Sequence, residues 1–179
     1  RRASADAGNP DGLRPRPRWA DDDNGVPSGA DPVIGYFVEY ESPRWRPIGV
    51  GCAGSAGLPV MTATTSPDLG ATFTLAVTNL PTAGGAFVMA IGFSDAFWPG
   101  VGPLPFELNL LGAPTCFVFC DPVLTETRPN LGEAGAWSLL VPTSPSLAGA
   151  VFFQQAFVVD PPANSFGLTV TNGGRAVLQ

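Results

Sequence analysis

The sequence of 179 residues contains no histidine and no lysine, and its nine basic residues are all arginines. Histidine is the usual general base near neutral pH and the commonest metal ligand in proteins. Its absence excludes histidine-based catalytic triads, zinc sites and proton shuttles. The sequence therefore predicts a protein that is not an enzyme and that uses no metal and no cofactor.

Charge is also scarce, because charged residues make up 13% of the chain, about half of the usual quarter. The net charge of −6 argues against nucleic-acid binding, which needs a basic surface to neutralise phosphates. The surface must consist largely of Ser, Thr, Asn, Gly, Pro and backbone. Such surfaces are common in secreted β-proteins and in subunits that neighbouring copies bury.

Long apolar segments are missing as well. A membrane-spanning helix needs about 20 consecutive apolar residues, and the nearest candidate, Ala148–Val159, is interrupted by Gln154 and Gln155. The sequence therefore predicts no membrane span. No signal peptide is recognised, so an exported protein with this sequence would be a mature form that has lost its leader.

The charges that are present divide the chain into two regions. Residues 1–46 hold seven of the nine arginines and eight of the fifteen acids. The first thirty residues, with the repeat Arg14-Pro-Arg-Pro-Arg18, have the composition of an extended or disordered tail. We therefore predict an extended N-terminal arm over residues 1–47 and a folded domain over residues 48–179.

One segment of the arm differs from the rest. Val33–Tyr40 is rich in β-branched and aromatic residues, which predicts a β-strand. Alternation places Tyr36, Val38 and Tyr40 on one face of this strand. The segment is the best candidate for a strand donated to another sheet.

Residues 48–179 show an all-β pattern of short strands separated by Pro or Gly turns, which predicts a sandwich of the immunoglobulin-like or jelly-roll type. In Thr72–Asn79, Phe73, Leu75 and Val77 are expected to face inward. No helix of ten or more residues is expected. The predicted strands are Val60–Thr65, Thr72–Asn79, Ala86–Phe93, Leu104–Leu110, Thr115–Phe119, Val123–Thr127, Ala136–Val141, Val151–Val159, Gly167–Thr171 and Arg175–Leu178, with a turn at Gly173-Gly174.

The three cysteines allow one disulfide and one leftover thiol. Cys116 and Cys120 share one face of a predicted strand, so either is a candidate partner for Cys52. The leftover thiol would be buried and inert or, as an alternative, would cross-link neighbouring subunits. A zinc site is not expected, because the cysteines lack ligand spacing and no histidine is present.

Several short motifs are spread along the domain: Gly51-Cys-Ala-Gly-Ser55, Leu69-Gly-Ala-Thr-Phe73, Leu111-Gly-Ala-Pro-Thr-Cys116, Asp160-Pro161, Ala163-Asn164 and Gly167-Leu168 through Asn172-Gly173. Together they resemble a secreted repeat domain of planctomycete-type bacteria. The resemblance covers roughly residues 49–178 and implies an extracellular β-sandwich without a named activity. It also implies a disulfide between Cys52 and Cys116. Cys120 departs from the pattern, and the arm is not covered.

Three groups of acidic side chains are candidate sites. Asp21–Asp23 could offer oxygen ligands to Ca²⁺, but Gly25 comes too early for an EF-hand loop, so a solvated turn is predicted. Asp95 and Glu107 flank a Pro-Gly-rich stretch, as paired glycosidase carboxylates can, although acids occur in almost any loop. Asp160 precedes Pro161 and is interpreted as a turn residue.

Ser55 lies in Gly54-Ser-Ala-Gly57, which lacks the spacing of a nucleophile elbow, and the chain offers no histidine base. We therefore do not interpret it as a nucleophile.

The four tryptophans are the remaining candidates for contacts. Trp137 lies in a predicted strand and is expected in the core. Trp98 lies in a loop, where an exposed indole could stack on a sugar. Trp19 and Trp45, in the arm, are expected to anchor it on a partner surface.

These features predict an extracellular structural subunit that self-assembles into a filament or surface layer. The arm would add a strand to the open sheet of the next copy. The alternative is a carbohydrate-binding or cell-surface attachment module that binds glycans through Trp98. The predicted subunit contacts are Trp19, Val33, Ile34, Tyr36, Val38, Tyr40 and Trp45.

Overall fold

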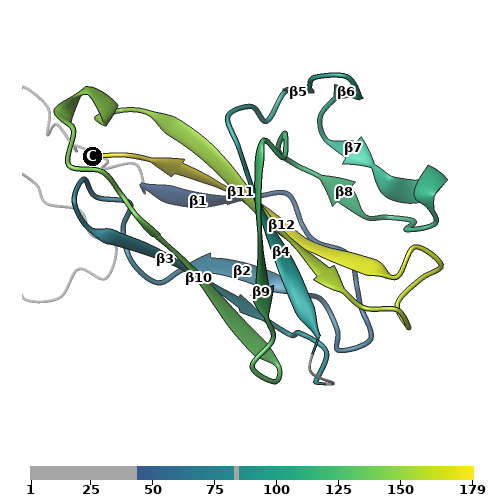
Figure 1. Cartoon of the computed structure of the whole chain (residues 1–179). Helices are drawn as coiled ribbons and strands as arrows, with labels where there is room; N and C mark the ends of the chain where they lie inside the picture. Colours follow the sequence, from purple (N-terminus) through teal and green to yellow (C-terminus); the bar gives the residue numbers. More distant parts are fainter. Residues whose placement is uncertain (1–43, 83–84) are drawn as a thin grey trace, which may run out of the picture. The chain divides into compact units, whose positions relative to one another are not determined.

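A computed structural model describes residues 44–82 and 85–179 (Figure 1). This part of the chain consists of β-strands and loops, and its two helical elements are single 3₁₀ turns. The all-β prediction is confirmed, as is the expectation that the domain contains no long helix. The turns are η1 (Leu108–Leu111) and η2 (Pro145–Leu147).

The strands form two main antiparallel sheets. The five-stranded sheet has the order β1 (Trp45–Ile48), β12 (Leu168–Val177), β11 (Val151–Val159), β4 (Ala86–Gly92), β9 (Leu124–Pro129). The three-stranded sheet has the order β10 (Ala134–Leu140), β3 (Thr72–Thr78), β2 (Val60–Ala63).

The core lies between these two sheets. Phe73, Leu75 and Val77 on β3 are fully buried, as their alternation predicts. They belong to one cluster with residues of the facing sheet such as Phe152, whose ring meets that of Phe73 edge-on at 6.0 Å. Trp137 is 2% exposed, which confirms its predicted place in the core.

Residues 93–122, between β4 and β9, cover the outer face of the five-stranded sheet, and we call them the covering segment (Figure 1). Cys116 and Val118 pack with Val170 of β12, and Cys120 packs with Phe153 of β11. The central strands β11 and β12 are therefore buried on both faces. The covering segment contains β5 (Phe97–Trp98), β6 (Gly102–Pro103), β7 (Phe106–Glu107), η1 and β8 (Phe117–Val118).

The prediction of one strand over Leu104–Leu110 is wrong. Only Phe106 and Glu107 are in β7, and the chain then turns into η1, which ends at Gly112 with φ 90°. The turn buries Leu108 at 4% exposure and leaves Leu110 at 92%. The left-handed conformation of Gly112 closes a helical turn at a place where an extended strand was predicted.

The predicted turn at Gly173-Gly174 is also wrong, because β12 runs through it without a break. A Cβ atom on Gly173 would lie 2.8 Å from Cβ of Phe119, and one on Gly174 would lie 2.5 Å from Nε1 of Trp45. Neighbouring aromatic side chains thus occupy the space beside the strand. Glycine is present here for close approach rather than for a turn.

Candidate functional site

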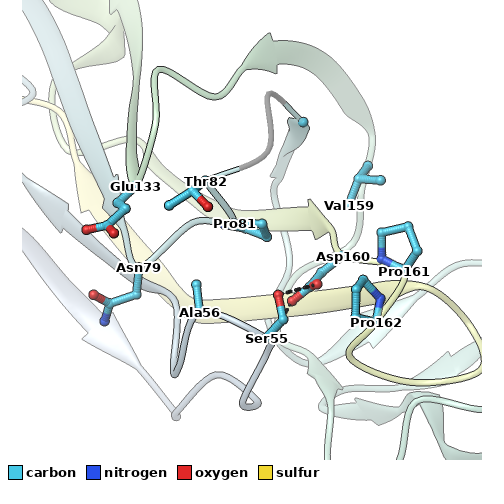
Figure 2. Close-up of a pocket in the computed structure, with 11 residues that line it drawn as sticks. Ser55, Ala56, Asn79, Pro81, Thr82, Glu133, Val159, Asp160, Pro161 and Pro162 are labelled. Carbon is cyan, nitrogen blue, oxygen red and sulfur yellow. Dashed lines mark hydrogen bonds between the residues drawn. The ribbon is translucent and has the colours of Figure 1, made fainter.

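A cleft of about 680 Å³ lies among the loops at one end of the sheets and is the candidate functional site (Figure 2). Its walls come from the turn before β2, the loops around β3, β4 and β10, and the end of β11. Its lining residues are Ser55, Ala56, Asn79, Pro81, Thr82, Gly85, Glu133, Val159, Asp160, Pro161 and Pro162.

Asp160 is the best-connected polar group of the cleft. It is 1% exposed, and its two carboxylate oxygens accept hydrogen bonds from the backbone N–H of Ser55 at 2.6 Å and from Oγ of Ser55 at 2.7 Å (Figure 2). A Cβ atom on Gly54 would collide with the same carboxylate. The carboxylate thus fastens the Gly54–Gly57 turn to the end of β11.

Only part of this arrangement is predictable from the sequence. The backbone of Asp160 does form a local turn, since its carbonyl accepts from the N–H of Ala163 at 3.0 Å. The side chain, however, reaches Ser55, which is 105 residues away in sequence. The Gly54–Gly57 turn and Asp160-Pro161 both stood out as motifs, but no local pattern could show that they meet.

Both donors of Ser55 that face Asp160, its backbone N–H and its hydroxyl, bond to this one carboxylate, so the pair holds the turn in place. The other acid, Glu133, is exposed and lies across the cleft from Asp160 (Figure 2). No group of three or more metal-ligating side chains occurs among the residues that the structure describes.

Three other acids of the domain lie outside this cleft, one of them buried. Asp121 is 6% exposed, and its Oδ1 accepts from the N–H groups of Phe93 and Ser94, both at 2.7 Å. These bonds join the start of the covering segment, at Phe93 and Ser94, to its end, at Asp121. Asp95 and Glu107, the candidate carboxylate pair, are both exposed on the covering segment.

The disulfide joins Cys52 to Cys116, as the family resemblance implies. It ties the covering segment to the loop between β1 and β2. Cys120 is a free, buried thiol. Burial raises the pKa of this thiol to about 12, with a further contribution from the negative charge of Asp121. At neutral pH it is therefore an uncharged apolar side chain.

A buried amide completes the attachment of the covering segment. Gln155 of β11 is fully buried, and its Oε1 accepts from the N–H of Phe119 at 2.8 Å. Its Nε2 donates to the carbonyls of Phe117 at 2.8 Å and Thr171 at 2.9 Å. In the sequence, Gln155 is recognisable only as an interruption of an apolar run.

Two of the predicted contact tryptophans lie in the described residues. Trp98 is half-buried, with its ring edge-on to Phe106 at 6.1 Å, and the more exposed aromatic of that hairpin is Phe97 at 54%. Trp45, assigned to the arm by composition, lies in β1, and its Nε1 donates to Oε1 of Gln154 at 3.1 Å.

The remaining predicted contacts, and the Asp21–Asp23 turn, lie outside the described residues. These contacts are Trp19, Val33, Ile34, Tyr36, Val38 and Tyr40.

No helix of the described residues is both long and apolar enough to cross a membrane. Comparison with family models, with curated proteins and with solved structures gives no match to this chain.

Proposed function

We propose that the protein is an extracellular structural subunit that self-assembles through its N-terminal arm by β-strand addition. The observation that carries this proposal is the outer face of the three-stranded sheet, which holds no charged side chain. Because Met61, Phe73 and Trp137 point into the core, alternation places their strand neighbours outward. The outward residues are Val60, Thr62, Thr72, Thr74, Ala76, Thr78, Ala134, Ala136, Ser138 and Leu140.

This face can be covered at little cost in desolvation. Oγ1 of Thr74 and Oγ of Ser138 share a hydrogen bond at 2.9 Å, so these two hydroxyls already have partners. The remaining surface is mainly methyl groups and small side chains. A sheet surface that lacks charges is typical of a contact between subunits.

The arm supplies the means of connection. It joins the domain at Arg44, whose side chain pairs with Asp68 and whose carbonyl accepts from the N–H of Val177 at 2.8 Å. Forty-three residues precede this point. At about 3.3 Å per extended residue they are long enough to reach a neighbouring domain, and they include the strand-like segment Val33–Tyr40.

The disulfide supports the proposed location. Disulfides persist in secreted and extracellular proteins, whereas cytosolic reductants keep thiols reduced. The Cys52–Cys116 bond therefore agrees with export.

Negative-stain electron microscopy of the full, unreduced chain at micromolar concentration tests the proposal. We expect regular filaments or sheets from the wild type and dispersed particles from Val38→Pro, which removes a hydrogen-bond donor from the donated strand. Gly29→Pro, in the same arm but outside that strand, is the matched control and should still assemble. Dispersed wild-type particles at every concentration would contradict the proposal.

A glycan-binding module is the second candidate, and the β5–β6 hairpin favours it. Phe97 is 54% and Val101 46% exposed there, next to the half-buried Trp98. In affinity gels containing polysaccharide, retardation of the protein that is lost in Phe97→Ala and Trp98→Ala would support this function. Phe166→Ala, an exposed aromatic on another loop, is the control.

A further inference from the structure

The two sheets have four edge strands, and an added strand can pair only with an edge that offers free backbone groups. Among the described residues, β1 and β9 end the five-stranded sheet, and β10 and β2 end the three-stranded sheet. In an antiparallel ladder, alternate residues of an edge strand bond to the neighbour and the others point away from it. The free groups of each edge can therefore be worked out from its hydrogen bonds.

A proline interrupts the free side of β1. The bond from the N–H of Val177 to the carbonyl of Arg44 shows which residues of β1 bond to β12, so the backbone groups of Arg46 also face β12. The backbone groups of Trp45 and Pro47 then face the free side. Pro47 has no N–H, and β1 is only four residues long, so this edge gives an incoming strand little to bond.

The free side of β9 is interrupted in the same way. The N–H of Asn130 donates to the carbonyl of Gly85 at 2.9 Å, so the backbone N–H and C=O groups of Arg128 and Glu126 face β4. Thr125, Thr127 and Pro129 point outward, and Pro129 has no N–H. The strand also carries the ion pair between Arg128 and Glu126, at 2.7 Å. Charges and proline are common means of protecting an edge.

A side chain occupies the free side of β2. Oδ1 of Asn172 accepts from the N–H of Met61 at 3.0 Å, and its Nδ2 donates to the carbonyl of Met61 at 3.1 Å. The amide of Asn172 thus takes the place of a strand at the middle of this four-residue edge. An added strand would have to displace it.

The edge of β10 has none of these features. The N–H of Thr64 donates to the carbonyl of Thr74 at 2.9 Å, so Thr74 and its alternate neighbours on β3 bond toward β2. The intervening residues of β3, such as Leu75, bond to the backbone of Trp137 and of its alternate neighbours on β10. The backbone N–H and C=O groups of Ala136 and Ser138 consequently point to the free side of β10.

The composition of β10 also leaves it open. Its seven residues, Ala-Gly-Ala-Trp-Ser-Leu-Leu, include no charged residue and no proline. Ala136 and Ser138 have exposed side chains, and Leu140 is 70% exposed. Contact with β9 includes a side-chain bond from Nε1 of Trp137 to Glu126 at 2.7 Å, but no backbone ladder joins the two strands in the described structure.

We infer that β10 is the acceptor edge, and that in the assembly Val33–Tyr40 of a second copy pairs with it. This inference rests on the proposed function and names the surface through which it operates. The donor segment has eight residues and no proline, and β10 has seven, so the two match in length. The paired strand would extend the three-stranded sheet and place half of its side chains beside the uncharged outer face.

Proline substitutions at two matched edge positions test the inference in the full chain. Ala136→Pro removes an outward N–H from β10, and Thr125→Pro removes one from β9. Both positions have exposed side chains and lie in edge strands, where proline leaves the internal ladder intact. We expect Ala136→Pro to raise the critical concentration for assembly, measured by sedimentation, by roughly tenfold or more. Thr125→Pro should assemble like the wild type.

Mixing two variants distinguishes donor from acceptor. Val38→Pro lacks a competent donor but keeps β10, and Ala136→Pro lacks the acceptor but keeps the donor. Neither should assemble alone, whereas a mixture should give discrete dimers that do not grow. Such dimers, seen by analytical ultracentrifugation, would support the pairing between copies.

The outcomes separate the inference from the function. If Val38→Pro fails to assemble while Ala136→Pro assembles like the wild type, the acceptor edge is wrong and the proposed function stands. If Val38→Pro assembles normally, both are wrong. Should Ala136→Pro prove unfolded by circular dichroism, amide hydrogen exchange of the wild type decides. Assembly should then slow exchange at Ala136 and Ser138 but not at Thr125 and Thr127, and unchanged exchange at β10 would overturn the inference.

Discussion

The two sheets of the domain treat their outer faces differently. The outer face of the five-stranded sheet carries Phe153, Phe157 and Val170, and the covering segment packs on them. The outer face of the three-stranded sheet carries mostly Thr, Ala and Ser, and none of the hydrophobic clusters among the described residues includes these side chains. One sheet is thus completed within the chain, whereas the other is left with an uncharged surface.

The difference is already visible in the strand sequences. β11, Val-Phe-Phe-Gln-Gln-Ala-Phe-Val-Val, is nearly continuous in large side chains, as expected for a strand that is buried on both faces. β3, Thr-Phe-Thr-Leu-Ala-Val-Thr, alternates, as expected for a strand with one buried face. A bare face made of small, uncharged residues therefore agrees with the proposed contacts between molecules.

Removing the disulfide is the most severe way to break this contrast. The bond closes a loop with a sequence separation of 64 residues, so its loss should lower the free energy of unfolding by roughly 4 kcal/mol. We expect the double variant Cys52→Ala/Cys116→Ala to lose this stability in urea titrations and to expose the apolar face beneath the covering segment, detected by binding of a hydrophobic dye.

Cys120→Ala, which leaves the disulfide in place, is the control for that experiment. It should shift the urea midpoint much less and bind no additional dye. Equal stability of the double variant and the wild type would show that buried packing alone holds the covering segment.

A smaller effect is expected from the amide beneath the covering segment. Gln155→Leu keeps the approximate size of the side chain but leaves three backbone groups, on Phe117, Phe119 and Thr171, without their partner. Unsatisfied buried groups cost about 1–3 kcal/mol each, and partial access of water should limit the total to about 2–4 kcal/mol. Urea titration measures the loss.

Gln154→Leu is the matched comparison. Gln154 is equally buried, but its side chain bonds only Nε1 of Trp45 and the carbonyl of Phe152. The loss should be smaller than for Gln155→Leu. A larger loss for Gln154→Leu would mean that the β1 side of the sheet, rather than the covering segment, depends on buried amides.

Sequence patterns identified the parts of the fold that depend on neighbours in the chain. The inward residues Phe73, Leu75 and Val77 follow from alternation, and Trp137 follows from its place in a strand. The Cys52–Cys116 pairing came from resemblance to a family, because spacing alone left Cys120 as an equal candidate.

What the patterns missed depends on contacts between distant segments. Gly173 and Gly174 look like a turn, but the rings of Phe119 and Trp45 occupy the space beside them. Asp160 looks like a local turn residue, yet its carboxylate holds Ser55. The phase of the hydrogen bonds at each edge, on which the choice of β10 depends, likewise requires the register between strands.

The smallest expected effect is a pH dependence of the free energy of unfolding. It arises from Cys120, beneath the covering segment, and not from the three-stranded sheet. Burial holds the pKa of Cys120 at about 12 in the folded protein, against 9.0 for an ordinary thiol. Above pH 9 the unfolded chain therefore loses this proton while the folded chain keeps it, so unfolding releases a proton and stability falls as pH rises. The free energy of unfolding therefore falls by at most about 1.4 kcal/mol per pH unit between pH 9 and 12, and this contribution vanishes below pH 9.

Urea titrations of the wild type and Cys120→Ala at pH 8 and pH 10 isolate this contribution. The difference in unfolding free energy between the two chains should shift by about 1 kcal/mol in favour of the variant as the pH rises. The three-stranded sheet has no titratable side chain on its outer face. The difference in unfolding free energy between the wild type and Ala76→Thr should therefore be the same at pH 8 and pH 10. A parallel pH dependence of wild type and Cys120→Ala would mean that the thiol reaches solvent and that the covering segment opens before the domain unfolds.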